Sequence, residues 1–208
     1  MGQGQRMVRL GFAGGTFPAG THICQIFSDD DERNDALMAF LLAGLQDGEL
    51  ATCFSERLDA GALKASLENH GLDLEALQQS GRLTLSGTRD VYFAENRFDP
   101  DRMLQRLSDY YDYSLQVGCP ARVIGEMTSE VTRVQGGERL MEYECGVSLM
   151  LQEKPITAVC QYEAQAFDGA TIMDVLRVHP MMVVRGEVLH NPFYVPPAEF
   201  LSRQEPRE

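Results

Sequence analysis

The sequence predicts an α/β protein with a mostly parallel sheet. From residue 21 to about residue 190, apolar runs of strand length alternate with helical patterns, and this alternation is typical of repeated βαβ units. A length of 208 residues suits a single domain, and a hydrophobic content of 44% suffices for a buried core. The longest apolar run, residues 37–45, is about half as long as a membrane-spanning helix.

The first half of the chain alternates strands with helices. Residues 21–27 form an apolar strand, and Ser28 with the three aspartates after it offers an N-cap and an acidic first turn. Leucines at four-residue spacing in residues 37–45 predict a core-facing helix that ends near Gly48. The next expected elements are a strand at 50–55, a helix capped by Asp59, a short helix at 73–79, a strand at 82–86 and a loop at 87–97.

The second half continues the pattern. Asp99 and Pro100 begin a helix whose apolar stripe reaches Leu115, because aspartate caps helices and proline suits their first position. The following elements are a strand at 121–126, a helix at 138–152, a strand at 156–162, a helix capped by Asp168 and a strand at 181–188, with the return arm of a hairpin as an alternative. Residues 1–20 and 196–208 are rich in glycine, proline or charge, and we expect them to be flexible.

The chain is uniformly acidic. Its 18 lysines and arginines against 31 aspartates and glutamates give a net charge of −13. Proteins that bind phosphate backbones or anionic lipids need a basic face, so neither direct nucleic-acid binding nor membrane binding is expected. The five cysteines form no Cys-x-x-Cys pair, which fits reduced thiols. Because the start lacks the apolar core of a secretory signal, we expect the protein in the cytoplasm.

Polar side chains follow several of the predicted strands. In an open parallel sheet, ligands bind beyond the carboxyl ends of the strands, so we expect a binding crevice there. The residues at this edge are Phe27, Ser28, Ser55, Glu56, Glu126, Met127, Gln161, Tyr162 and Glu163. A solvated rim without a ligand is the alternative interpretation, because loop mouths are polar in any such fold.

The segment after the first strand contains no phosphate-binding loop. A nucleotide hydrolase of this architecture needs Gly-x-x-x-x-Gly-Lys-Ser/Thr between the first strand and its helix. Residues 28–32 hold four carboxylates instead, which would repel a triphosphate. The sequence also has no Gly-x-Ser-x-Gly nucleophile motif. We therefore expect no ATP hydrolysis, no other enzymatic activity and no cofactor.

His22 and Cys24 are the candidate metal ligands. At i and i+2 on a strand they project from the same face, about 6 to 7 Å apart, and could bind a soft metal or a polar ligand group. A metal would need two further ligands, for which Cys160 and Glu126 are candidates, so the ligand set is incomplete. A core histidine beside an inert cysteine is the alternative. His179, which precedes a proline, is interpreted as a helix-boundary residue.

Several segments, in order along the chain, resemble those of a known sensory family. Residues 20–27 (GTHICQIF), the acidic helix after them and residues 40–49 (FLLAGLQDGE) resemble the opening of the MEDS family, a sensory domain first described in methanogens and methylotrophs and in the dichloromethane regulator DcmR. The later segments that agree are 122–127 (RVIGEM), 160–162 (CQY), and 179–180 (HP) followed by 191–194 (NPFY).

The resemblance implies a RecA/KaiC-type three-layer fold without its phosphate loop, and a role in sensing simple hydrocarbon derivatives for transcription factors and histidine kinases. It makes His22 and Cys24 the expected ligand or metal contacts, with Glu126 and Cys160 as neighbours in the sheet. Phe27 stands where family members commonly have tyrosine, so one hydrogen bond to a ligand is lost. With the strand-end residues, the expected ligand-binding set is His22, Cys24, Gln25, Phe27, Glu56, Glu126, Cys160 and Tyr162.

Three functional hypotheses follow. The first is a non-catalytic sensory domain over residues 21–195 that binds a small organic ligand and signals to a protein partner or through a homodimer. The second is a metal- or thiol-dependent redox protein or enzyme that uses His22, Cys24 and Cys160. The third is a degenerate RecA-like interaction module that docks through residues 193–197. No helix-turn-helix or kinase segment fits in the remaining residues, so we expect this chain to act alone or as one piece of a longer protein.

Overall fold

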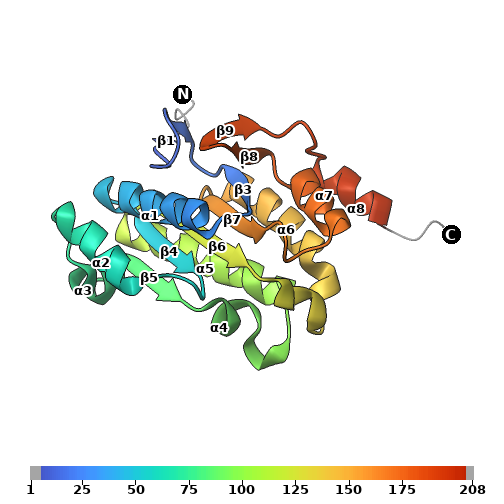
Figure 1. Ribbon diagram of the computed structural model, residues 1–208, viewed down its shortest axis with the longest axis horizontal. Coiled ribbons are helices and arrows are strands. Elements are labelled where there is room, and N and C mark those ends of the chain that lie inside the picture. Colours follow the sequence, from blue (N-terminus) through green and yellow to red (C-terminus); the bar gives the residue numbers. More distant parts are fainter. Residues whose placement is uncertain (1–5, 205–208) are drawn as a thin grey trace.

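A seven-stranded sheet runs through the centre of the computed structural model, which describes residues 6–204 (Figure 1). In spatial order its strands are β5 (Leu83–Ser86), β4 (Leu50–Phe54), β6 (Ala121–Met127), β7 (Thr157–Glu163), β3 (His22–Phe27), β8 (Met181–Val184) and β9 (Glu187–His190). Neighbouring strands from β5 to β8 pair in parallel, and β8 with β9 forms an antiparallel hairpin at one edge. The predicted mostly parallel sheet is confirmed.

Helices cover both faces of this sheet (Figure 1). One face carries α1 (Asp30–Gln46), α2 (Ala60–Asn69) and α3 (Leu74–Gln79). The other carries α5 (Pro100–Val117), α6 (Leu140–Glu153) and α7 (Gly169–Val178). A last helix, α8 (Pro197–Gln204), packs Phe200 against Cys145 of α6 and Val178 of α7. The three-layer α/β architecture is therefore confirmed. None of the helices in residues 6–204 is long and apolar enough to cross a membrane.

Each face of the sheet has its own apolar core. On the α1 face, Leu37, Leu41 and Leu45 pack against Ile124 and Val159 of the sheet, as the leucine spacing predicts. The core under α5, α6 and α7 includes Leu107, Val147, Ala158, Tyr162 and Val175. Because side chains alternate along a strand, every sheet residue belongs to one of these two faces.

The residues that the sequence predicts as helix caps do cap helices in the structure. The side chain of Asp59 accepts hydrogen bonds from backbone amides at the start of α2, Asp99 does so for α5, and Asp168 does so for α7. Gly118 ends α5 in the left-handed region, with a φ of 68°. These elements therefore begin and end where the sequence predicts, within about two residues.

Two expectations about local structure are wrong. Residues 87–97 are not a loop, because α4 (Thr88–Tyr92) and a 3-10 turn at Ala94–Asn96 occupy them. Tyr92 explains the difference, since its ring packs edge-on against Phe54 and Tyr143 and fixes the segment to the core. Residues 181–188 are not one strand either, because Arg185 and Gly186 both have positive φ and form the turn between β8 and β9.

The two ends expected to be flexible contain regular structure. Within residues 6–20, β1 (Met7–Val8) pairs with β2 (Phe17–Pro18). Val8 and Leu10 are buried against the α1 core, which ties this hairpin to the domain. At the other end, α8 lies within the expected tail. The rest of both expected flexible ends, residues 1–5 and 205–208, lies outside the described residues.

Arg122 joins the hairpin, α1 and the sheet on the α1 face. Its side chain is fully buried. Nε donates to Glu49 Oε2 at 2.5 Å, Nη1 to the Phe40 carbonyl at 2.7 Å and Nη2 to the Arg9 carbonyl at 3.0 Å. The guanidinium also lies over the Phe40 ring, 4.6 Å from its centroid. Each of the three nitrogens of this buried cation thus has a hydrogen-bond partner, which offsets the cost of burial.

Candidate functional site

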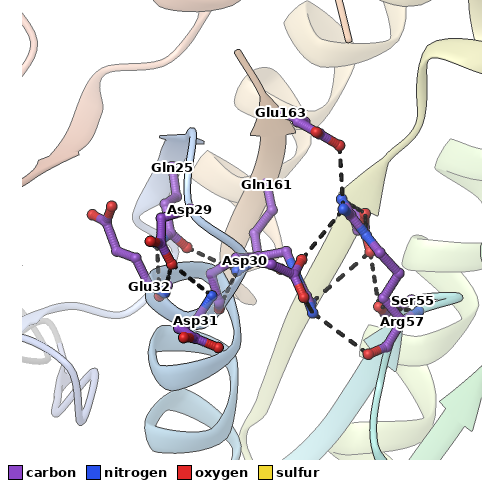
Figure 2. Close-up of polar contacts among 11 residues, drawn as sticks. Gln25, Asp29, Asp30, Asp31, Glu32, Ser55, Arg57, Gln161 and Glu163 are labelled. Atoms are coloured by element: carbon purple, nitrogen blue, oxygen red, sulfur yellow. Dashed lines mark hydrogen bonds and ion pairs between the residues drawn. The ribbon is translucent and has the colours of Figure 1, made fainter. Parts of the chain in front are cut away.

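A network of ion pairs closes the carboxyl edge of the sheet (Figure 2). Arg57 Nε donates to Glu126 Oε1 at 2.6 Å, and Ser55 Oγ donates to Glu126 Oε2 at 2.9 Å. Arg57 Nη1 also lies 3.3 Å from Asp30 and 3.2 Å from Glu163. Since Glu126 is 2% exposed, these neighbours supply the hydrogen bonds that its buried carboxylate needs.

The first turn of α1 is acidic and directly follows β3 (Figure 2). Asp29 is the N-cap, and its Oδ1 accepts hydrogen bonds from the amides of Asp31 at 2.8 Å and Glu32 at 3.2 Å. Backbone amides at a helix N-terminus can bind phosphate or another anion. Here the Asp29 carboxylate already accepts hydrogen bonds from these amides, and the other side chains of the turn are acidic.

Four of the expected ligand residues lie at this edge. Gln25 accepts a hydrogen bond of 2.7 Å from the amide of Gln161 on β7. Phe27 is covered by Arg57, whose Cζ is 5.3 Å from the ring centroid. Glu126 belongs to the network above, and Glu56 accepts a hydrogen bond from the Arg89 amide. A cavity of about 380 Å³ opens beside Glu56 and Glu126, with six charged residues among its ten lining residues.

Arg57→Met is expected to lower the free energy of unfolding by about 1.5 kcal/mol, because it removes charge-assisted hydrogen bonds from the buried Glu126. Chemical denaturation measures the change. The matched control is Arg89→Met, since Arg89 pairs with Glu130 at the surface and its loss should change stability by less than about 0.5 kcal/mol. Equal effects of the two substitutions would contradict a structural role of the Arg57 network.

On the opposite face, four potential metal ligands converge. His22 on β3, Glu144 on α6, Cys160 on β7 and His179 after α7 place one ligating atom each within 4.8 Å of one another, and we call them the His-Glu-Cys cluster. His22 Nε2 is 3.4 Å from both Cys160 Sγ and Glu144 Oε2. Glu144 Oε2 is also 3.7 Å from Cys160 Sγ and 3.5 Å from His179 Nε2. Cys160 is partly buried, and the other three are at most 2% exposed.

Outer hydrogen bonds orient both imidazoles of the cluster. His22 Nδ1 is 2.8 Å from Ser148 Oγ, and the Ser148 hydroxyl donates to the Val178 carbonyl at 3.0 Å. Since that hydroxyl has a single hydrogen, its oxygen accepts from His22 Nδ1. His179 Nδ1 donates to the Val175 carbonyl at 2.7 Å. In the neutral form of each ring, the lone pair is therefore on Nε2, the atom that faces the cluster.

Burial and the neighbouring side chains together shift the pKa values of the cluster. Burial, followed by the nearby His179, lowers the pKa of His22 to about 4, so this imidazole is neutral near pH 7. Burial by itself would raise the pKa of Glu144, but His179 and His22 together lower it below its ordinary value. The hydroxyl of Tyr162 also donates to Glu144 Oε1. Burial, reinforced by the Glu144 charge, raises the pKa of the Cys160 thiol well above its ordinary value.

An apolar cavity of about 540 Å³ reaches this cluster from the amino-terminal ends of the strands. His22 and Ser148 form part of its wall, and Met181 of β8 and Val188 and Leu189 of β9 form another part. The remaining lining residues are Phe17, Pro18, Gly20, Thr21, Gln152, Pro180, His190 and Tyr194. This cavity lies at the edge of the sheet opposite to the expected crevice.

The structure divides the predicted site residues between two faces. His22, Cys24, Cys160 and Tyr162 lie on the α6 face, and Cys24 pairs in register with Cys160. Glu126 was expected beside them as a further metal ligand, and this expectation is wrong. Glu126 pairs with Gln161, one position along from Cys160, and one position reverses the face of a strand. Cys24 was also a candidate metal ligand. Within residues 6–204 it does not belong to the His-Glu-Cys cluster.

Sequence reasoning missed two members of the cluster. His179 is a helix-boundary residue as expected, since it is the C-cap of α7, but its ring also packs 4.1 Å from that of His22. Its place in the His-Pro segment of the resemblance was a usable signal. The sequence held no comparable signal for Glu144, because a single glutamate in an amphipathic helix is normally exposed.

Comparisons with known proteins agree with this fold. A family model described as MEthanogen/methylotroph, DcmR Sensory domain (MEDS) matches residues 21–180. A KaiC-like protein from Pyrococcus horikoshii has a similar structure, with 16% identity, a TM-score of 0.59 and coverage of 86% of this chain and 79% of that chain. The flagellar accessory protein FlaH from Methanocaldococcus jannaschii is similar too, with 13% identity, a TM-score of 0.60 and coverage of 88% and 84%.

The structural similarities show the fold alone, since both identities are low. A search of curated proteins found no match. The family match covers most of the chain, and its segments include His22, Glu144, Cys160 and His179. The chain therefore belongs to the MEDS family of sensory domains.

Proposed function

We propose that this chain is a sensory domain that binds a small hydrocarbon-derived ligand in the cavity at the amino-terminal edge of the sheet and signals to a protein partner, such as a histidine kinase or a transcription regulator. The observation that carries the proposal is the 540 Å³ cavity with His22 and Ser148 in its wall. Membership of a sensory family supports the same class of function.

The chemistry of the cavity fits such a ligand. Small-molecule sites are commonly cavities of about 300 to 1,000 Å³ with apolar walls and a few convergent polar groups. Met181, Val188 and Leu189 supply apolar wall, while the polar groups of His22 and Ser148 lie at the inner end. A molecule with a short apolar body and one polar head would bury both parts here.

The cavity also joins two parts of the fold that a ligand could tie together. One wall is the central strand β3 with α6, and the other is the β8–β9 hairpin at the edge of the sheet. Asn191 anchors the end of this hairpin by donating to the His179 carbonyl at 2.9 Å. Leu189 and Phe193 are each 49% exposed at this edge. A ligand that changes the hairpin position would therefore change a surface that offers apolar contacts to a partner.

Ligand binding is tested with a set of short-chain alcohols, carboxylic acids and halogenated alkanes, measured by thermal shift and ligand-observed NMR. A compound at a concentration of about 100 times its Kd stabilises the folded state by about 2.7 kcal/mol. For a chain of this size the melting temperature should rise by roughly 5 to 10 °C. Absence of binding by every compound in both measurements would contradict the proposal.

Leu189→Trp should weaken binding of the best compound about tenfold or more, because the indole fills the cavity from its rim. The matched control is Leu149→Trp on α6, since Leu149 is 48% exposed, close to the 49% of Leu189, and does not line the cavity. Isothermal titration measures both affinities. If both variants bind like the parent protein, the ligand binds elsewhere and the cavity assignment is wrong.

A further inference from the structure

The His-Glu-Cys cluster contains more hydrogen-bond acceptors than donors. His22 Nε2, His179 Nε2 and Glu144 Oε2 all face the same point, and each is an acceptor when the imidazoles are neutral. The Cys160 thiol supplies one hydrogen, which can satisfy one of the three. His179 Nε2 has no hydrogen-bond partner within residues 6–204. A proton or a metal cation between these atoms would relieve the repulsion of their lone pairs.

The spacing of these atoms is that of ligands around one metal ion. Zinc bonds of about 2.0 to 2.3 Å to nitrogen, oxygen and sulfur place tetrahedral ligand atoms roughly 3.3 to 3.6 Å apart. The four short distances in the cluster are 3.4, 3.4, 3.5 and 3.7 Å. All four ligating atoms lie within 4.8 Å of one another, so small side-chain shifts complete the tetrahedron.

The surroundings of the cluster are also those of a metal centre. Ligating histidines normally donate their other ring nitrogen to an oxygen acceptor, as His22 does to Ser148 and His179 does to the Val175 carbonyl. The second oxygen of Glu144 is held by the Tyr162 hydroxyl. A site that holds a divalent ion, one thiolate and one carboxylate has no net charge, which suits a buried position.

We propose that His22, Glu144, Cys160 and His179 bind one zinc-type divalent transition-metal ion in a four-coordinate site. On binding, the ion forms a bond to Cys160 Sγ, the S–H bond breaks and the proton passes to solvent, so no oxidant or reductant is required. Thiolate, imidazole and carboxylate together favour such an ion over Mg²⁺ or Ca²⁺, which prefer oxygen ligands. The cavity gives the ion a route to His22.

The test measures metal directly on the full 208-residue chain, expressed with added Zn²⁺ and purified without chelators. Elemental analysis should find one zinc ion per chain. After exchange for Co²⁺, the protein should show the ligand-field absorption of a tetrahedral site and a thiolate-to-cobalt charge-transfer band. Cys160→Ser should lose that band, and His179→Gln should lose stoichiometric metal.

Two further variants keep the test decisive where a ligand variant fails to fold. Cys24→Ser is the matched control, because Cys24 is the register partner of Cys160 but lies outside the cluster, so the band should persist. Ser148→Ala keeps all four ligands and removes the outer partner of His22, and it should weaken Zn²⁺ affinity by roughly 10- to 100-fold in a competition titration.

Metal-free parent protein with no cobalt spectrum would overturn the proposal, and so would loss of the band in Cys24→Ser with its retention in Cys160→Ser. Unchanged affinity in Ser148→Ala would equally contradict the assignment of His22 as a ligand. The proposal does not depend on the hydrocarbon ligand. Binding of organic compounds to chelator-treated protein tests the cavity separately, so either proposal can fail while the other stands.

Discussion

Replacing Arg122 by methionine is expected to lower the free energy of unfolding by about 4 kcal/mol, the usual cost of removing one partner from a buried ion pair. The substitution leaves Glu49 buried, and among residues 6–204 the half-exposed Arg6 is then its only remaining ion-pair partner. It also frees the Phe40 and Arg9 carbonyls. The melting temperature should fall by roughly 8 to 16 °C. Denaturation in urea with an unchanged m-value would show that the loss is one of stability.

The control for this prediction is Arg139→Met. Arg139 pairs with Glu142 and Asp101 at the surface, and exposed ion pairs contribute little. We expect a change of less than about 0.5 kcal/mol. If Arg122→Met lowered the free energy of unfolding as little as Arg139→Met, the Arg122–Glu49 pair would not be what holds the hairpin to the sheet.

Gly44→Ala is expected to destabilise the protein by about 3 kcal/mol, although alanine normally stabilises a helix by about 1 kcal/mol relative to glycine. A Cβ at position 44 would lie 2.2 Å from Arg122 Nε and 2.4 Å from Arg122 Cδ. The arginine cannot move aside, because its guanidinium makes hydrogen bonds to groups on three different segments. Thermal denaturation of the single variant measures the cost.

A double-mutant cycle identifies the cause. In the Arg122→Met background the more flexible methionine can yield, so Gly44→Ala should cost far less than in the parent chain. Gly169→Ala at the start of α7 is the control, because a Cβ there meets nothing within 4 Å. Equal costs of Gly44→Ala in both backgrounds would show that the clash with Arg122 is not responsible.

These two predictions concern the α1 face, whereas both proposed functions belong to the other face and the opposite edge. The carboxyl edge, where open parallel sheets commonly bind ligands, is occupied here by Asp29 and by the ion pairs of Arg57 and Glu126. The cavity and the His-Glu-Cys cluster lie where β3, β8 and α6 meet.

The candidate site was only partly predictable. Period-2 alternation correctly places His22 and Cys24 on one face, because that relation holds within a single strand. The relation of His22 to Glu126 depends on the register of β3, β7 and β6, and a shift of one residue exchanges the faces. The amino-terminal cavity depends on the β8–β9 hairpin, whereas the sequence predicts a strand at 181–188 and offers the return arm of a hairpin only as an alternative.

The sequence by itself determined the order of strands and helices, their caps and the α/β class, because these follow from short-range periodicity and from local hydrogen bonds to the backbone. Only the tertiary structure decided that His22, Glu144, Cys160 and His179 meet. They lie on β3, on α6, on β7 and after α7. Their meeting depends on strand order and on helix packing, and these long-range contacts leave no periodic signal in the chain.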